Sequence, residues 1–256
     1  MIQPSLAAFV RNANIGDSQE TDLEELSSTW FDGKAFFLLR SSNLGFAGLA
    51  TSVAIVETEP SRVEDRRLVI ARYGKEVYAR RALRPLETSM VALAAETPDP
   101  RKSPPTLLVH ENEVVLHRVV GMLFNAKVTA PTSKSEAVQI DGAGGLAYVR
   151  SAYKVKEDSA IPLALPGQIA LGGEQINLDK LDDHLDAYVA LHLDDGSSIF
   201  KRVGEKLPSS LDHLRRFETI GGLGVADILS IGKFQPGFRA VEKAVLVLGI
   251  LYHLSP

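Results

Sequence analysis

Two stretches far apart in this chain match closely enough to indicate that one fold occurs twice. "YVALHLDDGSSIFKR" (188–202) aligns with "LVIARYGKEVYARR" (68–81), with one extra residue in the turn. "VLGILY" (247–252) aligns with "VVGMLF" (119–124), and the matching pieces follow one another in the same order. Such a long repeat period is typical of tandem domains, because the repeats of a solenoid are only about 20–50 residues long.

The matching pieces are rich in β-branched residues and are bounded by turn residues, as strands are. "TSVAIVET" and "RRLVIARYG" are examples from the first half, and "GKEVYARRAL" continues as a hairpin partner. In the second half, Asp194-Asp195-Gly196 predicts a hairpin turn. Helical periodicity is weak, and the best candidate, "SLDHLRRFETI", is expected to form either one short helix or a strand-bearing loop. We therefore predict a mainly β protein of two tandem β domains related by internal duplication.

Composition divides the chain into four segments. Residues 1–28 are polar and acidic, which indicates a flexible arm. Residues 29–126 form the first predicted β domain, and residues 145–256 form the second. Residues 127–144 are rich in Ala, Thr, Ser and Gly, which is typical of a linker. The chain of 256 residues is long enough for two domains of about 100–150 residues each.

The overall charge and residue usage exclude several classes of function. A net charge of −4 provides no basic surface for phosphates, so we expect no direct nucleic-acid binding by this chain. The absence of cysteine excludes disulfides and thiolate metal sites. No apolar signal segment is evident, and the longest apolar run, "AVLVLGILYHL", is too short for a bilayer, which needs about 20 residues. We expect a cytoplasmic protein without a membrane partner.

The histidines and glycines do not predict a metal or a cofactor. His184 and His192 lie among aspartates but on a predicted loop and a predicted strand, without a common face. His110 and His117 are expected to be ordinary strand residues, whereas metal ligands must converge on one point. The glycine-rich "DGAGG" and "IGGLGVADI" lack the Lys-Ser/Thr ending of a phosphate loop and a βαβ frame.

One serine and one lysine are the candidates for chemistry. Ser159 lies in "EDSAIPLALPGQ", and Lys201 lies in "SIFKRV" on a predicted strand. A serine hydroxyl is a poor nucleophile at neutral pH and needs a base. A lysine can be that base when it is neutral, and burial beside apolar residues such as Phe200 and Val203 favours the neutral amine. Taken alone, this pair is weak, and Ser159 could equally be a solvated turn residue.

The two blocks that contain these residues resemble the LexA/UmuD-like serine–lysine self-cleaving regulators, whose fold is shared with phage-repressor C-terminal domains and signal peptidases. The nucleophile motif of that family reads roughly Gly-Asp-Ser-Met-x-Pro, followed by Gly-Asp and an apolar strand. "EDSAIPLALPGQIAL" follows the motif with matches at Asp158, Ser159, Pro162 and Gly167, whereas Ala160 replaces the Met and Gln168 the second Asp. The family's Val-Lys-Arg-aliphatic strand is similar to the segment that holds Lys201 and Arg202. The resemblance covers about residues 145–254.

The first half resembles the same domain in degraded form. Ser42 falls near the nucleophile position, but Asn43 follows it and the other landmarks are missing. Arg80 lies where the lysine should be. An arginine stays protonated at any usual pH and cannot be the base. The resemblance therefore implies a catalytically silent first domain.

The resemblance also implies a mechanism for the second domain. Neutral Lys201 would take the proton of Ser159, whose oxygen attacks a carbonyl while backbone N–H groups hold the oxyanion. In the family the substrate is usually a segment of the same chain, cut after a small residue. Ala143-Gly144 is the suspected cleavage site, although a flexible glycine linker or a cut in another chain remains open.

Three functions follow as expectations. The first is a self-cleaving serine–lysine peptidase in a stress (SOS-like) or phage-type transcriptional regulatory circuit. The second is a catalytically silent dimerisation or protein-binding module of the same fold, with a second copy or another regulatory protein as its partner. The third, a peptidase of the signal-peptidase type, is disfavoured by the lack of a predicted membrane anchor.

Overall fold

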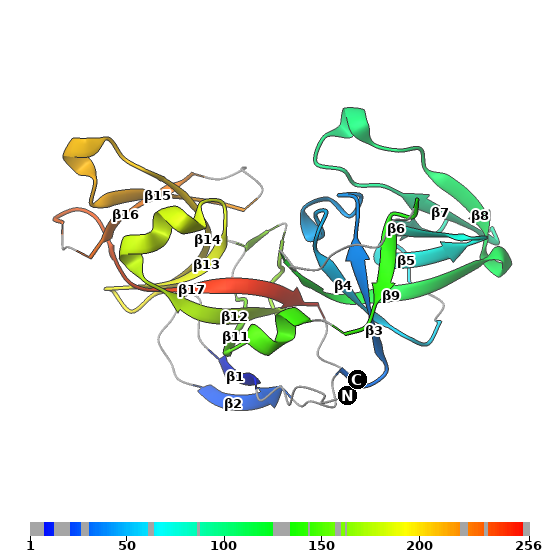
Figure 1. Cartoon of the computed structure of the whole chain (residues 1–256), viewed down its shortest axis with the longest axis horizontal. Coiled ribbons are helices and arrows are strands. Elements are labelled where there is room, and N and C mark those ends of the chain that lie inside the picture. Colours follow the sequence, from blue (N-terminus) through cyan, green and yellow to red (C-terminus); the bar gives the residue numbers. More distant parts are fainter. Residues whose placement is uncertain are drawn as a thin grey trace. The chain divides into compact units, whose positions relative to one another are not determined.

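The computed structural model describes residues 8–12, 21–26, 31–60, 64–85, 88–124, 134–142, 144–156, 160–161, 163–220, 225–232 and 235–252. The protein is mainly β, as predicted, and its strands are joined by turns and short 3-10 helices (Figure 1). No helix in the described ranges is both long and apolar enough to cross a bilayer.

The chain forms two compact units, and each contains a piece of the opposite chain end. The C-half unit consists of Met1–Ser28 and Ala147–Ile250. The N-half unit consists of Thr29–Leu146 and Leu251–Pro256. These bounds differ from the predicted ones because the terminal segments pack with the half of the chain that is distant in sequence.

The N-half unit contains two sheets that share one long strand, β9 (Figure 1). Its strands are β3 (Lys34–Leu39), β4 (Val53–Glu57), β5 (Arg67–Tyr73), β6 (Glu76–Leu83), β7 (Met90–Ala94), β8 (Leu107–His110), β9 (Val114–Leu123) and β10 (Ala137–Ile140). The first sheet has the order β10–β3–β4–β9, and the second has the order β9–β5–β6–β7–β8, all antiparallel. Buried aliphatic side chains of both sheets form the core.

The C-half unit contains a small closed barrel with additional strands at one side. Its strands are β1 (Ala8–Asn12), β2 (Thr21–Leu26), β11 (Ser151–Lys154), β12 (Ile169–Ile176), β13 (Tyr188–Leu193), β14 (Ser198–Lys206), β15 (Leu214–Glu218), β16 (Asp227–Ile231) and β17 (Ala240–Leu251). Strands β13–β14–β15–β16 pair in turn, and β17 closes the barrel by pairing with both β16 and β13. The remaining strands extend from β17 in the order β12–β11–β1–β2.

The short helical elements connect these strands. They are η2 (Gly45–Ala47), η3 (Pro100–Lys102), η4 (Glu111–Glu113), η5 (Gly144–Tyr148), η7 (Leu178–His184) and η8 (Ser209–Leu211). The segment for which a short helix or a strand-bearing loop was expected, "SLDHLRRFETI", contains the end of the single turn η8 followed by strand β15, and so corresponds to the second alternative. The predicted hairpin turn is present, since Gly196 has a φ of 79° and its N–H donates to the carbonyl of Leu193 at 2.9 Å.

The two units share one order of strand pairing. The N-half order β3–β4–β9–β5–β6–β7–β8 corresponds to β11–β12–β17–β13–β14–β15–β16 in the C-half unit. The registers correspond as well, since Val69 lies opposite Arg80 and Val189 lies opposite Lys201. This is the alignment that the sequence predicts. The internal duplication stays a prediction, and the shared pairing supports it.

The edge strands lie in segments where none was expected. The predicted arm, residues 1–28, contributes β1 and β2, and β1 pairs in parallel with β11. The predicted linker, residues 127–144, contributes β10, which pairs with β3. Because β3 and β11 hold equivalent positions, each unit covers the same exposed edge with a strand from outside its predicted domain. Covering an edge satisfies backbone groups that would otherwise pair with another chain.

Candidate functional site

Lys201 lies in the barrel of the C-half unit, on the core-facing side of strand β14. It is directly opposite Val189 of β13, and its side chain is only 7% exposed. Val189 and Val203 belong to the hydrophobic cluster of the barrel. The expected apolar surroundings are therefore present, and a lysine buried in this way requires a partner for its charge.

The partner of Lys201 is a carboxylate that sequence reasoning missed. Lys201 Nζ lies 2.8 Å from Oδ2 of Asp227, the first residue of β16, whose side chain is 31% exposed. The other carboxylate oxygen accepts a hydrogen bond from Arg239 Nη2 at 3.3 Å. A carboxylate in contact with an amine favours the protonated amine. The amine of Lys201 is therefore engaged in an ion pair with Asp227 inside the barrel.

The predicted nucleophile, Ser159, lies outside the described residues, as do Asp158 and Pro162. The distance from its hydroxyl to Lys201 is therefore not part of the structure. The loop around it is anchored at both ends. The carbonyl of the fully buried Ala160 accepts the N–H of Leu163 at 2.9 Å. At the far end, the N–H of Gly167 donates to the carbonyl of Val155 at 2.7 Å.

The corresponding loop of the N-half unit has the same length and the same closing hydrogen bonds. Leu38 lies opposite Val53, and Lys154 lies opposite Ile169, so that residues 39–52 match residues 155–168 one for one. The closing bonds also match: Leu39 N–H to the Ser52 carbonyl and Val155 N–H to the Gln168 carbonyl are both 2.8 Å long. Each loop has a left-handed residue at the same place, with φ of 74° at Thr51 and 89° at Gly167.

Counting along these matched loops places Asn43, rather than Ser42, at the position of Ser159. Ser42 lies one residue earlier, and its Oγ accepts the N–H of Ala50 at 3.1 Å. Asn43 is buried, and its carbonyl accepts the N–H of Glu96 at 2.8 Å. This count follows sequence numbers between the strand registers at the two ends of each loop, and because Ser159 lies outside the described residues, the equivalence of Ser42 stays a prediction.

Arg80 holds the register position of Lys201 in the N-half unit, as predicted. It is buried, and Glu136 binds it twice, with Nη2 to Oε1 at 2.5 Å and Nε to Oε2 at 2.9 Å. Its third contact is a hydrogen bond from Nη1 to the carbonyl of Pro105 at 3.2 Å. All three nitrogens of this guanidinium donate hydrogen bonds, and an arginine has no capacity to act as a base.

The suspected cleavage site is only partly described. Ala143 lies outside the described residues, and Gly144 is the first residue of η5.

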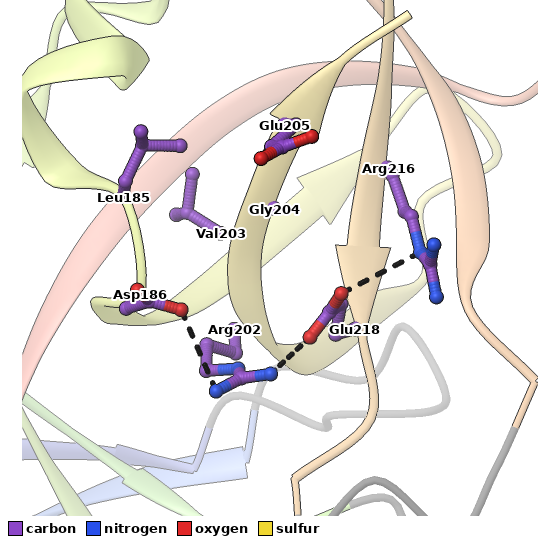
Figure 2. A pocket seen from close by; sticks show the side chains of 8 residues that line it. All are labelled: Leu185, Asp186, Arg202, Val203, Gly204, Glu205, Arg216 and Glu218. Carbon is purple, nitrogen blue, oxygen red and sulfur yellow. Dashed lines mark hydrogen bonds and ion pairs between the residues drawn. The ribbon is translucent and has the colours of Figure 1, made fainter.

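A groove of about 310 Å³ lies beside the C-terminal half of β14. Its walls carry three acidic and two basic side chains, and its full lining is Leu185, Asp186, Arg202, Val203, Gly204, Glu205, Arg216 and Glu218. Figure 2 shows Arg202 between Asp186, at 3.4 Å, and Glu218, with Arg216 approaching Glu218 at 3.5 Å. These four side chains pair with one another, and the lining contains neither serine nor lysine. The groove therefore offers polar contacts but no nucleophile.

His192, on strand β13, makes contacts with neighbouring side chains of its unit. His192 Nδ1 lies 2.9 Å from Ser198 Oγ, and the Tyr153 ring lies 5.9 Å from the imidazole. Burial, and to a lesser degree the charge of Lys243, lowers the pKa of His192. No group of three or more residues suited to hold a metal occurs in the part of the chain that the structure describes.

No protein-family model matches this chain, and no curated protein matches it at a significant level. The likeness to LexA-type domains accordingly rests on the motif residues around Ser159 and Lys201.

Proposed function

We propose that this chain is a catalytically silent protein-binding module built from two LexA-like β domains. The observation that carries the proposal is the 2.8 Å ion pair between Lys201 and Asp227. A serine nucleophile needs a base that is free to accept a proton. In both units, the residue at this register is a cation held by a carboxylate, since Glu136 holds Arg80 in the same way.

The proposed partner is a second copy of the chain or another regulatory protein in a cytoplasmic stress or phage-type circuit. Apolar side chains at equivalent positions of the two matched loops support this, since Leu49 is 38% exposed and Leu165 is 50% exposed. Burial of such side chains in an interface stabilises a complex.

Two measurements test the proposal. The purified chain should show concentration-dependent association in sedimentation velocity, and the paired substitution Leu49→Ser with Leu165→Ser should weaken it. The chain should also remain intact during long incubation at mildly alkaline pH, as judged by mass spectrometry, with Ser159→Ala indistinguishable from the parent. A monomer that binds no regulatory protein, or fragments that disappear in Ser159→Ala, would refute the proposal.

A second candidate is the self-cleaving serine–lysine peptidase. One observation favours it: Lys201 is buried at the register position where the resemblance requires a lysine. This function predicts a fragment that ends at Ala143 or at another small residue, formed by the parent and absent from both Ser159→Ala and Lys201→Ala.

A further inference from the structure

The charged groove beside β14 contains a carboxylate that its internal ion pairs do not use. Glu205 has no ion-pair or hydrogen-bond partner among the described residues, and Figure 2 shows it apart from the contacts of Arg202. Acidic side chains outnumber basic ones in the lining of the groove and also in the C-half unit as a whole. The groove is therefore suited to a cationic group from outside the unit.

The strand pairing is irregular beside this groove. Between Val203 and Lys206, β14 contains one residue more than the opposite segment of β15. A β-bulge of this kind redirects side chains, and bulges are frequent next to functional sites. The corresponding β6–β7 pairing of the N-half unit is regular over its described length, and Ala94 there holds the position of Glu218.

A buried arginine holds the bulge in place. Arg215 is only 1% exposed, and its Nη1 donates to the carbonyl of Gly204 at 3.1 Å, while its Nη2 binds Asp182. In the N-half unit the equivalent residue is the fully buried Val91. A buried ion pair is often less stabilising than an apolar residue of similar size. The bulge and the buried charge are thus not required by this strand arrangement, which indicates that they shape the groove for a function.

The N-half unit presents a basic group of the matching kind. The loop between β7 and β8 contains η3, in which Arg101 is 89% exposed and Lys102 is 82% exposed. Figure 1 shows this loop projecting beyond the two strands that it joins. Lys102 Nζ lies 3.9 Å from Oδ2 of Asp99, which is too far for a hydrogen bond. The ammonium of Lys102 is therefore available to a carboxylate of another molecule.

The tip of this loop is fixed in its exposed conformation. The carboxylate of Asp99 accepts the N–H of Arg101 at 3.2 Å, and the carbonyl of Asp99 accepts the N–H of Lys102 at 3.0 Å. The segment "TPDPRKSPP" (97–105) is also rich in proline, which restricts the backbone. Because the loop is ordered in advance, little conformational entropy is lost when it docks.

We propose that the groove is the docking site for this loop of a second copy of the chain, with Lys102 bound to Glu205. The complementary charges of the groove in one unit and of the loop in the other favour this occupant. The inference rests on the proposed protein-binding function, and it names the partner and the contact. Each copy carries both the loop and the groove, so the contact joins two different surfaces.

A charge swap tests this contact in the full-length chain. Lys102→Glu and Glu205→Lys each place like charges across the contact, so each should weaken self-association at least about 10-fold in sedimentation velocity. An equimolar mixture of the two variants should regain the affinity of the parent. In the mixture, Lys102 of one variant meets Glu205 of the other, and the two substituted residues also attract each other.

Matched control variants separate the contact from the overall charge. Lys75→Glu and Asp212→Lys change the net charge by the same amounts, at exposed positions outside the groove and outside the loop. Both controls should associate like the parent. Circular dichroism verifies that all four variants are folded, which is expected because each substituted side chain is exposed.

Chemical cross-linking provides a second readout. A carbodiimide joins an amine to a carboxylate with which it is in contact. A mixture of ¹⁴N-labelled and ¹⁵N-labelled chains should yield a Lys102–Glu205 cross-link that contains both isotopes, as identified by mass spectrometry. If this cross-link forms only between peptides of the same isotope, the contact lies within one chain, and the proposal is overturned.

The outcomes distinguish this inference from the proposed function. Self-association that is unchanged by both charge substitutions but weakened by Leu49→Ser with Leu165→Ser overturns the groove contact and leaves the binding module intact. A parent chain that stays monomeric at every concentration overturns the groove contact as well. Restored association in the mixture supports the groove contact even if the parent cleaves itself, because cleavage refutes only the silence of the module.

Discussion

Arg80 and Lys201 occupy one register position in two units, and each is bound by a carboxylate from outside its own hairpin. The acids are Glu136, beside β10, and Asp227, at the start of β16. In both units a long cationic side chain fills this interior position, while its counter-charge comes from a different strand. A site with this arrangement is electrostatically satisfied, which favours a binding or structural role over base catalysis.

Glu136→Gln should destabilise the protein by about 3 kcal/mol, because it leaves the charge of Arg80 buried without a counter-charge. The pair is largely hidden from water, with side chains 3% and 16% exposed, so solvent screening is weak. Urea unfolding followed by fluorescence measures the change. Glu64→Gln is the matched control, since the Glu64–Arg67 pair is 67% and 41% exposed and should change stability by less than about 1 kcal/mol. Equal effects of the two substitutions would contradict this account.

The hairpins of both units were predictable from the sequence, but the partners of the buried cations were not. The β5–β6 and β13–β14 pairs are local, so the alternation of residue types and the turn residues define them. Arg80 and Lys201 could be aligned for that reason. Glu136 and Asp227 lie far from those hairpins in sequence, and nothing in the local pattern of an isolated acid indicates which cation it binds.

The edge strands were missed for a different reason. β10 and β1 are only four and five residues long and lie within polar segments. Their alternation of polar and apolar residues is therefore too short to predict a strand. Their structure comes from pairing with β3 and β11, which is a tertiary effect.

The matched loops provide a pair of reciprocal substitutions. Thr51 has a φ of 74°, which is costly for a β-branched residue, whereas Gly167 adopts 89° at the equivalent position without strain. Thr51→Gly should raise stability by about 1 kcal/mol, and Gly167→Ala should lower it by about the same amount. A Cβ at Gly167 would meet nothing within 4 Å, so backbone strain alone is measured there. Thermal unfolding of both variants shows whether each substitution raises or lowers the stability. A destabilised Thr51→Gly would show that contacts of the threonine side chain stabilise the protein by more than the backbone strain costs.

Asp182 should make the C-half unit sensitive to acid. Its hydrogen bonds with Lys206, and then with Arg215, lower the pKa of Asp182 below its ordinary value. A depressed carboxyl pKa contributes stability that is fully present above the unfolded value of about 3.9 and is lost as the pH falls through the folded value. The contribution is reduced by solvent, because the Asp182 side chain is 49% exposed. Unfolding free energies measured from pH 6 downward should fall less steeply in Asp182→Asn than in the parent, and parallel slopes would rule out this role.

The titration of His192 should also lower the stability of the protein as the pH falls, but in a higher pH range than the titration of Asp182. Burial and the charge of Lys243 lower the pKa of His192, so the unfolded chain binds the proton more readily than the folded one. Its contribution to stability is therefore complete above the unfolded value of about 6.5 and is lost as the pH falls below it. A protonated Nδ1 could no longer accept a hydrogen bond from Ser198. The other ring nitrogen, Nε2, is buried and has no hydrogen-bond partner among the described residues.

His192→Gln removes the titrating group and retains polar atoms near Ser198. The parent should lose stability between pH 7 and pH 5.5, whereas the variant should show a flatter profile in urea unfolding. A variant with the parent's slope would assign the loss to another group.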